Sequence, residues 1–321
     1  MPPPNPVPEA LRHRRFTVAQ ARAHGVTARM VQGRRFRRLL DGVHVCVDTP
    51  VDLRVWLRAA VQVLPGDAVL THVTRLHALG VHVGPAWPLR FASTHVHRTR
   101  RQELQVTRVR VLPPNEHRVA TVEHAWVTAC ADLDLVDAVT AADWLLHLRR
   151  TDRARLEAYA RSFHGRGAVA ARRAVVLVRD RVESPRETYL RLLLVLAGLP
   201  EPQCNVDLGS DRAFVGRADL VFLAYALIVE YDGRDHAQVV TQWNRDLERL
   251  DAFEDTRWGY VRVTAHRLKR PRDVVRRVHA KLVARGYDGP APVSTPRWVA
   301  LFEHRTAARR AAESPAPTSW A

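Results

Sequence analysis

The sequence predicts an α/β protein with more than one domain, and three observations favour that fold class. The chain has 321 residues, more than one typical compact domain needs. Hydrophobic residues make up 46% of it and charged residues 26%, which is ordinary for a globular protein, so disorder is not the default. Helical and strand-like patterns alternate along the chain. We expect an N-terminal helical module with a β-hairpin, a mixed α/β middle domain, and a C-terminal α/β domain with a mixed central sheet.

After a proline-rich tail at residues 1–9, which we expect to be disordered, residues 10–50 predict a small module of helices and a hairpin. Thr17 and Thr27 suit the N-caps of two short helices, with a turn at Gly25 between them. The following "RRLLDGVHVCV" carries an Asp-Gly hairpin signal between apolar runs. Helix, tight turn, helix and wing together predict a winged helix-turn-helix.

The charge of the chain indicates a polyanionic partner. Fifty Lys and Arg against 33 Asp and Glu give a net charge of +17, and only Lys269 and Lys281 are lysines. A GC-rich genome accounts for arginine in place of lysine but not for the excess of cations, so we expect DNA as the partner; the alternative is a solvated basic surface. The winged-helix residues expected to contact DNA are Arg29, Arg34, Arg35, Arg37 and Arg38. The alternative for these arginines is the solvated face of a helical cap that binds protein or nothing.

The cysteines and the hydropathy pattern favour a cytoplasmic protein. Cys46, Cys130 and Cys204 are far apart and odd in number, so they predict neither a disulfide framework nor a zinc site. The start "MPPPNPVPEA" lacks the apolar stretch of a signal peptide, and no apolar run reaches the roughly 18 residues of a membrane span. We therefore expect a reducing compartment and no membrane partner.

Residues 51–170 predict the mixed α/β middle domain. The stretches "VDLRVWLRAAVQVLP" and "AVLTHVTRLHALGV" have helical periodicity, and "LRFASTHVHRTR" with "LQVTRVRVLP" alternates like a hairpin. A further helical region covers residues 122–148. Five histidines match no metal-ligand spacing and are interpreted as surface or packing residues: His72, His77, His82, His95 and His97.

The first half of the chain resembles a known family. The Gly25 turn, the arginines before "DGVHV" and the stretch "LTHVTRLHALGV" look like the N-terminal part of the AbiEi-type antitoxins. That family joins a winged-helix DNA-binding module to a second domain. The resemblance implies DNA binding and a toxin or defence-system partner.

Residues 178–288 predict the C-terminal domain. A helix is expected from Glu183-Ser184-Pro185 to about Ala197, with Gly198 as its C-cap. The strands "QCNVDLG", "GRADLVFL" and "ALIVEYDG" follow, then a helix over "VVTQWNRDLERLDAFED", the strand "YVRVT" and a last helix. Residues 289–321 are expected to be a partly disordered tail that includes a helical "PRWVALFEHRTAARRAA".

Two acids on neighbouring predicted strands indicate a metal site. Asp219 begins one strand and Glu230 ends the next, with a turn at residues 223–225, so antiparallel pairing sets the two opposite each other on one face. An unpaired buried carboxylate costs on the order of several kcal/mol, so a cation or another partner is needed. Hard carboxylate oxygens suit Mg²⁺ or Mn²⁺. Asp232 extends the same face, and His236 could move a proton or orient water there.

This C-terminal pattern resembles the PD-(D/E)XK nuclease superfamily, and within it the very-short-patch-repair (Vsr-like) endonucleases. The resemblance rests on "SPRETYLRLLLVLAGLPEP", "RADLVF", "IVEYDGRDH", "RDLERLDAF" and "GYVRVT", and with the antitoxin-like half it gives a combination of actinobacterial type. It implies a restriction-endonuclease-like fold with Asp219 and Glu230 as metal-binding acids. It further implies that Glu187 on the first helix contacts the metal or its water. His236 would also belong to the catalytic site, and the supporting residues would be Asp246, Arg249 and Arg262. Asp232 stands where the superfamily consensus has a lysine, a departure that the Vsr-like branch shares.

The expected function is a metal-dependent DNA endonuclease with an N-terminal DNA-binding regulatory module. One alternative is a transcriptional regulator, antitoxin-like, whose nuclease fold is inactive. Another is a repair nuclease that uses Trp243 or Trp258 as a wedge in the duplex. Structural alternatives for the supporting residues are an Asp246–Arg249 pair on a helix surface, Glu183 charging a helix N-terminus, and Arg262 pairing with Glu187 or Asp232.

Overall fold

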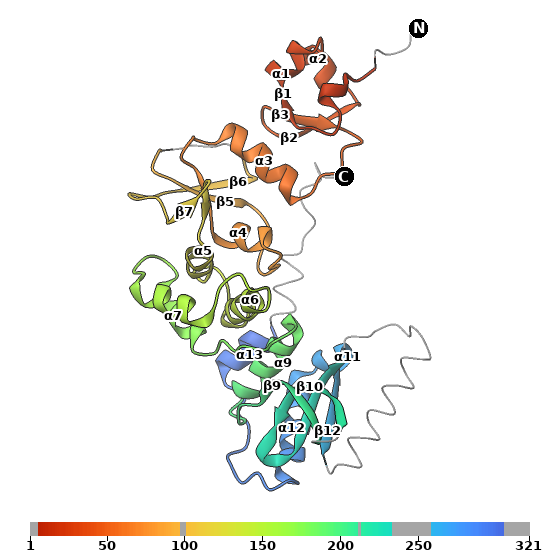
Figure 1. Cartoon of the computed structure of the whole chain (residues 1–321), viewed down its shortest axis with the longest axis vertical. Coiled ribbons are helices and arrows are strands. Elements are labelled where there is room, and N and C mark those ends of the chain that lie inside the picture. Colours follow the sequence, from red (N-terminus) through yellow and green to blue (C-terminus); the bar gives the residue numbers. More distant parts are fainter. Residues whose placement is uncertain (1–5, 97–100, 211–212, 233–257, 305–321) are drawn as a thin grey trace. The chain divides into compact units, whose positions relative to one another are not determined.

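A computed structural model describes residues 6–96, 101–210, 213–232 and 258–304 (Figure 1). The chain forms two compact units, residues 1–128 and 129–321. Both contain helices and β-sheets, so the α/β fold class predicted from the sequence is confirmed. Within the described ranges no helix is long and apolar enough to cross a membrane.

The N-terminal module has the two capped helices and the hairpin that the sequence predicts. Its elements are β1 (Phe16–Thr17), α1 (Val18–Ala23), α2 (Ala28–Val31), β2 (Phe36–Leu40) and β3 (Val43–Cys46), with the sheet order β1-β3-β2. Thr17 forms a capping box with Gln20, and the Thr27 side chain accepts a hydrogen bond from the Met30 N–H. Gly25 has a φ of 76°, the left-handed conformation that the turn needs.

A small hydrophobic core holds these elements together. Phe16 of β1 packs edge-on against Phe36 of β2 at 5.4 Å between ring centroids. Ala21 of α1, Val31 of α2 and Val26 of the turn between them belong to the same cluster, as does Leu11. Because both helices bury one face on the sheet, their opposite faces stay open to solvent.

The rest of the first unit is a five-stranded sheet with helices. Its elements are α3 (Leu53–Val63), β4 (Val69–Leu70), α4 (His72–Ala78), β5 (Leu89–Ser93), β6 (Leu104–Arg108), β7 (Asn115–Glu116), β8 (Val119–Ala120) and α5 (Val122–Ala129). The strand order is β6-β5-β4-β8-β7.

The predicted hairpin between β5 and β6 is wrong, because the two strands pair in parallel. Leu89 lies opposite Leu104 and Ser93 opposite Arg108, so both strands run in the same direction. Alternating apolar and polar residues indicate a strand with one buried face, but the alternation is the same for either direction of pairing. The direction is set by the connection, which carries no two-residue turn signal here.

The second unit begins with helices that the sequence places in the middle domain. They are α6 (Leu135–His147), α7 (Arg153–Ser162) and α8 (Ala168–Val175), followed by α9 (Pro185–Val195). The helical region at residues 122–148 is divided between α5 and α6, and Asp134 caps α6 by accepting a hydrogen bond from the Asp137 N–H at 2.7 Å. Helix α9 starts where the sequence predicts, with Ser184 as its N-cap, and Gly198 follows it with a φ of 94°.

A four-stranded mixed sheet forms the centre of this unit. Its strands are β9 (Gln203–Ser210), β10 (Ala213–Phe222), β11 (Leu227–Asp232) and β12 (Gly259–Thr264), in the order β12-β11-β10-β9. The pairs β9–β10 and β10–β11 are antiparallel, and β11–β12 is parallel. The helix expected between β11 and β12 lies outside the described residues. The order of the described elements otherwise follows the sequence prediction.

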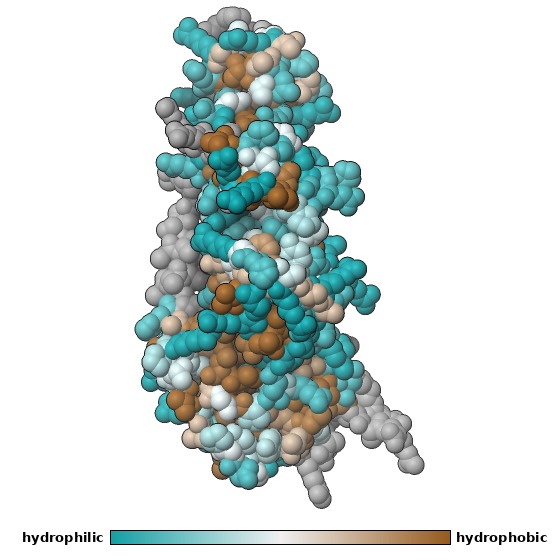
Figure 2. Space-filling view, turned by 90° about the vertical axis from the view of Figure 1, so that its left-hand side faces the viewer, coloured by the Kyte–Doolittle hydropathy of each residue, from teal (hydrophilic) through white to brown (hydrophobic). Residues whose placement is uncertain are grey.

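Three helices follow the sheet: α11 (Ala265–Leu268), α12 (Pro271–Val283) and α13 (Pro296–Phe302). Helix α13 lies at the start of the helical stretch predicted within the C-terminal tail and ends at Phe302. It packs on α9, because the buried Trp298 indole donates to the Leu193 carbonyl at 3.0 Å and Phe302 lies edge-on to Tyr189 at 5.4 Å. In Figure 2, hydrophobic residues gather in the lower half of the picture, on the second unit.

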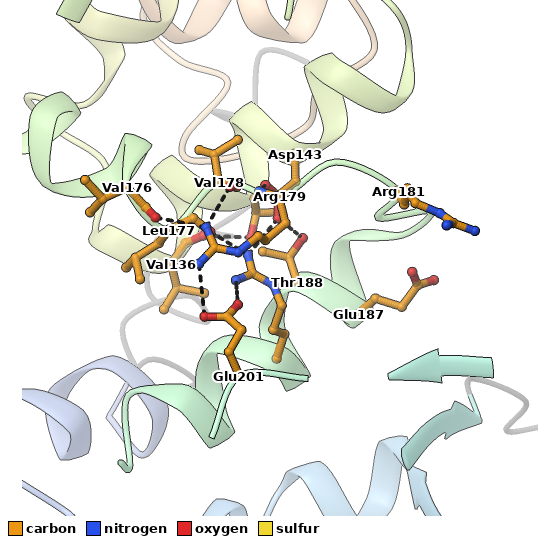
Figure 3. Close-up of polar contacts among 12 residues, drawn as sticks. Val136, Asp143, Val176, Leu177, Val178, Arg179, Arg181, Glu187, Thr188 and Glu201 are labelled. Carbon is orange, nitrogen blue, oxygen red and sulfur yellow. Dashed lines mark hydrogen bonds and ion pairs between the residues drawn. The ribbon is translucent and has the colours of Figure 1, made fainter. Parts of the chain in front are cut away.

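A buried ion pair fastens α6 to α9 (Figure 3). The side chains of Asp143 and Arg191 are fully buried and lie 3.1 Å apart. Asp143 also accepts hydrogen bonds from the Arg179 N–H and the Thr188 hydroxyl, both at 2.9 Å, and Arg191 also contacts Glu201 at 2.9 Å. Burial raises the pKa of Asp143 to about 6, although the Arg191 charge and the hydrogen bonds oppose that shift. The network fixes the helix that carries Glu187.

Candidate functional site

The candidate site centres on two acids that face each other across β10 and β11. The strands pair with Leu220 opposite Val229 and Phe222 opposite Leu227, around the predicted turn at Leu223–Tyr225. The same register places Asp219 opposite Glu230. Both residues are partly buried, and the antiparallel pairing predicted from the sequence is confirmed.

Each of the two carboxylates accepts a hydrogen bond. Asp219 Oδ2 accepts from the Tyr231 N–H at 2.8 Å, and Glu230 Oε2 accepts from the Tyr260 hydroxyl at 2.7 Å. Burial, and then the neighbouring Glu230 charge, raise the pKa of Tyr260 above its usual value, so the phenol stays a donor. These bonds offset part of the cost of burying the two acids.

Arg262 supplies positive charge on the same face. In the parallel β11–β12 pair, Glu230 lies opposite Arg262 and Asp232 opposite Thr264. The Arg262 Nε lies 3.7 Å from Asp232 Oδ2, a long ion pair between partly buried side chains. Of the two partners considered for Arg262, Asp232 is therefore the one in contact. Asp232, Glu230 and Arg262 share one face of the sheet because strand period and parallel register agree.

Glu187 is held at the start of α9. Its Oε2 accepts hydrogen bonds from Asn205 Nδ2 at 2.6 Å and from the Glu183 N–H at 2.9 Å, and its own N–H donates to the Ser184 hydroxyl. Figure 3 shows Glu187 apart from the network around Asp143, on the side of Arg181. These contacts are those of a helix cap, in which the carboxylate satisfies donors near the helix N-terminus.

The donor set determines whether a metal ion fits here. In the part of the chain that the structure describes, no three or more His, Cys, Asp or Glu side chains are grouped so as to hold a metal ion. Mg²⁺ commonly uses only one or two carboxylates, with water and substrate phosphates completing its octahedron. Asp219 and Glu230 meet that minimum, because the strand register sets them opposite each other on one face of the sheet. The described residues therefore fit Mg²⁺ bound together with a phosphate.

Other predicted site residues fall outside this centre. His236, Asp246 and Arg249 lie outside the described residues. Glu183, considered as a charge at a helix N-terminus, forms an ion pair with Arg217 at 2.6 Å.

The winged-helix arginines divide into two groups. Arg29, Arg34 and Arg38 are exposed. Arg37 donates to the Thr49 carbonyl at 2.7 Å, and the Arg35 guanidinium lies 5.9 Å from the Phe36 ring centroid. Arg29, Arg34 and Arg38 are therefore better placed to reach a ligand. Arg37 instead contacts the backbone that follows β3.

Two residues of the site were not predicted from the sequence. Tyr260 precedes Arg262 by two residues, so strand period alone could have placed it on the same face. Asn205 is buried and has a φ of 47°, a conformation that asparagine tolerates better than most residues. Strand β9 also contains Gln203 and Asp207, so a polar residue at position 205 gives no distinctive local signal.

Comparisons with known proteins give relatives without a stated activity. No protein-family model matches the chain, and no solved structure matches it significantly. It is 28% identical over 171 residues to two proteins of Mycobacterium tuberculosis, the uncharacterized protein Rv2248 of strain H37Rv and the uncharacterized protein MT2308 of strain CDC 1551. The match covers 52% of this chain and 60% of each relative. The chain is thus similar to mycobacterial proteins over about half its length.

Proposed function

We propose that this chain is a metal-dependent DNA endonuclease whose N-terminal winged helix binds DNA. The observation that carries the proposal is the placement of Asp219 and Glu230 on one face of adjacent strands, in a domain ordered helix, three antiparallel strands, parallel fourth strand. The order matches the Vsr-like resemblance stated from the sequence. The net charge of +17 supports a DNA substrate.

In this proposal the residues on one face of the sheet have different roles. Asp219 and Glu230 would hold Mg²⁺, and the Tyr231 N–H and the Tyr260 hydroxyl orient the two carboxylates. Mg²⁺, when bound, neutralises charge on the phosphate and lowers the pKa of water. Arg262, opposite Glu230, places a fixed positive charge where negative charge develops during hydrolysis.

One observation favours a second candidate, a DNA-binding regulator with an inactive nuclease fold. Glu187, which the resemblance assigns to the metal, is 7% exposed and bonded to Asn205 and the Glu183 N–H. A carboxylate engaged in this way supports α9 instead of a metal ion. The antitoxin-like reading of the first half of the chain, with a toxin or defence-system partner, belongs to this candidate.

Cleavage of supercoiled plasmid with Mg²⁺ or Mn²⁺ separates the two. Asp219→Asn and Glu230→Gln keep the size of each side chain and an oxygen acceptor while removing the charge. We expect each to slow nicking by about 100-fold or more, as loss of a group that stabilises transition-state charge does. Asp207→Asn is the matched control, since Asp207 is an exposed carboxylate of the same sheet, paired with Arg217 at 3.0 Å.

The outcomes discriminate between the candidates. Nicking by the wild type and by Asp207→Asn, but not by the two site variants, supports the endonuclease. Equal nicking by all four proteins rejects the metal site. DNA binding in a gel shift at two salt concentrations, with no nicking by the wild type under either metal, supports the regulator.

A further inference from the structure

A basic cavity of about 470 Å³ lies where β12 meets α11 and α12. Its polar lining consists of Arg262, His266, Arg267, Arg270, Asp273 and Arg277, and we call it the arginine pocket. Four arginines against one aspartate leave a net charge of +3 with the histidine neutral. Its volume is within the roughly 300–1,000 Å³ of small-molecule sites, so it can hold a phosphate with an attached sugar.

The positive charge of the arginine pocket is available to a ligand. Asp273, its one acid, is paired with Arg276 on the same helix, which does not line the pocket. Arg270 and Arg277 are exposed, and their side chains have no hydrogen-bond or ion-pair partner among the residues described. Several like charges that face one cavity repel each other, and a bound anion relieves that repulsion.

The arginine pocket adjoins the candidate acid site. Arg262 lines the pocket and is also the residue that contacts Asp232 at 3.7 Å. Arg267 Nη1 donates to the Arg262 carbonyl at 2.9 Å, which directs a second pocket arginine along β12. Val261, Val263 and Val274 give the cavity an apolar part beside its cations. A phosphate joined to a less polar sugar matches this combination better than a free inorganic anion does.

We propose that the arginine pocket binds a backbone phosphate of the DNA strand, one that neighbours the phosphate at Asp219 and Glu230. The inference rests on the proposed function, because it takes the two acids as the cleavage site. In it Arg270 and Arg277 are positioning residues that anchor the strand, and Arg262 links the anchored phosphate to the acid face. The pocket contributes to strand affinity without touching the reacting atoms.

Binding measured without cleavage tests the proposal. Fluorescence anisotropy of a labelled duplex is recorded with the full chain in EDTA, at several salt concentrations from about 50 to 200 mM. Arg277→Ala is compared with Lys281→Ala, a matched control that removes one exposed cation four residues later on α12, outside the pocket. Arg270→Ala/Arg277→Ala enlarges the effect. Equal thermal melting temperatures show that the variants fold alike.

Loss of one phosphate contact reduces the magnitude of the negative slope of log K against log salt by about 0.9. We expect part of that change for Arg277→Ala, the full change of about 0.9 for the double variant, and none for Lys281→Ala. Equal slopes for Arg277→Ala and Lys281→Ala overturn the proposal. Tight binding of a mononucleotide by the wild type, with no change of duplex slope in the variants, assigns the pocket to free nucleotides and overturns the strand assignment.

The salt dependence of DNA binding and the cleavage of plasmid can fail independently of each other. If the protein does not nick plasmid but the slope changes only in the pocket variants, the phosphate site is supported and the endonuclease is rejected. If nicking depends on Asp219 and Glu230 but all slopes are equal, the endonuclease is supported and the phosphate site in the arginine pocket is rejected.

Discussion

Replacing Arg191 by methionine is expected to destabilise the second unit by about 4 kcal/mol. Breaking a buried ion pair from one side costs roughly 3–5 kcal/mol, because the remaining charge stays buried without its partner. In Arg191→Met, Asp143 keeps its bonds to the Arg179 N–H and the Thr188 hydroxyl but loses its counter-charge, and the Leu177 carbonyl loses its 2.8 Å donor. Glu201 is 34% exposed and can turn to water, so it adds little.

Urea denaturation followed by circular dichroism measures this free energy of unfolding. The double variant Arg191→Met/Asp143→Leu removes both charges, and we expect it to recover at least half of the loss, since an apolar replacement of a buried pair is often neutral. Arg161→Ala is the control, because its pair with Glu157 is solvent-exposed and contributes less than about 0.5 kcal/mol. A loss below about 1 kcal/mol in Arg191→Met, or a double variant less stable than the single one, would refute this reasoning.

Three further predictions concern single groups. Because the pKa of Asp143 is about 6 in the folded chain and 3.8 is its ordinary value, the folded state binds this proton more tightly. The wild type should therefore lose stability relative to Asp143→Asn as pH rises from about 4 to about 6, by at most about 3 kcal/mol in urea denaturation. A gain of stability over the same pH range would contradict a raised pKa of Asp143. Gly198→Ala should cost about 1 kcal/mol in the same assay from its positive φ alone, since no atom lies within 4 Å of an added Cβ; an unchanged midpoint would exclude this backbone strain. Burial raises the pKa of Cys130 to about 12 and that of Cys204 to about 11, and Cys46 is also buried. A thiol-disulfide reagent should therefore modify the native protein far more slowly than the urea-unfolded protein. Equal rates would show that the thiols are accessible in the native protein.

The elements that the sequence predicts correctly are specified by neighbouring residues. Thr17, Thr27 and Ser184 each cap a helix by accepting a hydrogen bond from an N–H three residues later, so the signal and the structure lie within one turn. The pairing of β10 with β11 is equally local, because a short turn leaves one register that places the apolar residues of both strands inward. Asp219 and Glu230 could therefore be set opposite each other from the sequence.

The features that were missed or wrongly predicted depend on partners far along the chain. Arg191 pairs with Asp143, 48 residues earlier on another helix, and no local pattern joins them. Strand β6 pairs with β5 in parallel, and the alternation of apolar and polar residues along the two strands does not distinguish parallel from antiparallel pairing. Asn205 was missed for the same reason, since its amide bonds Glu187 across 18 positions of sequence.

Under the proposed function, the role of Asp232 depends both on its place in the sequence motif and on the pairing of β11 with β12. The resemblance to the PD-(D/E)XK nucleases sets Asp232 where their consensus has a lysine, which by itself implies the loss of a cation. The parallel pairing of β11 with β12 brings Arg262 opposite Glu230 and within 3.7 Å of Asp232, so a cation reaches the same face from the neighbouring strand. Asp232 then orients Arg262, and an isolated Asp232→Lys change would set two cations side by side instead of restoring the consensus arrangement. The charge of this face is thus a property of two strands, and neither strand alone defines it.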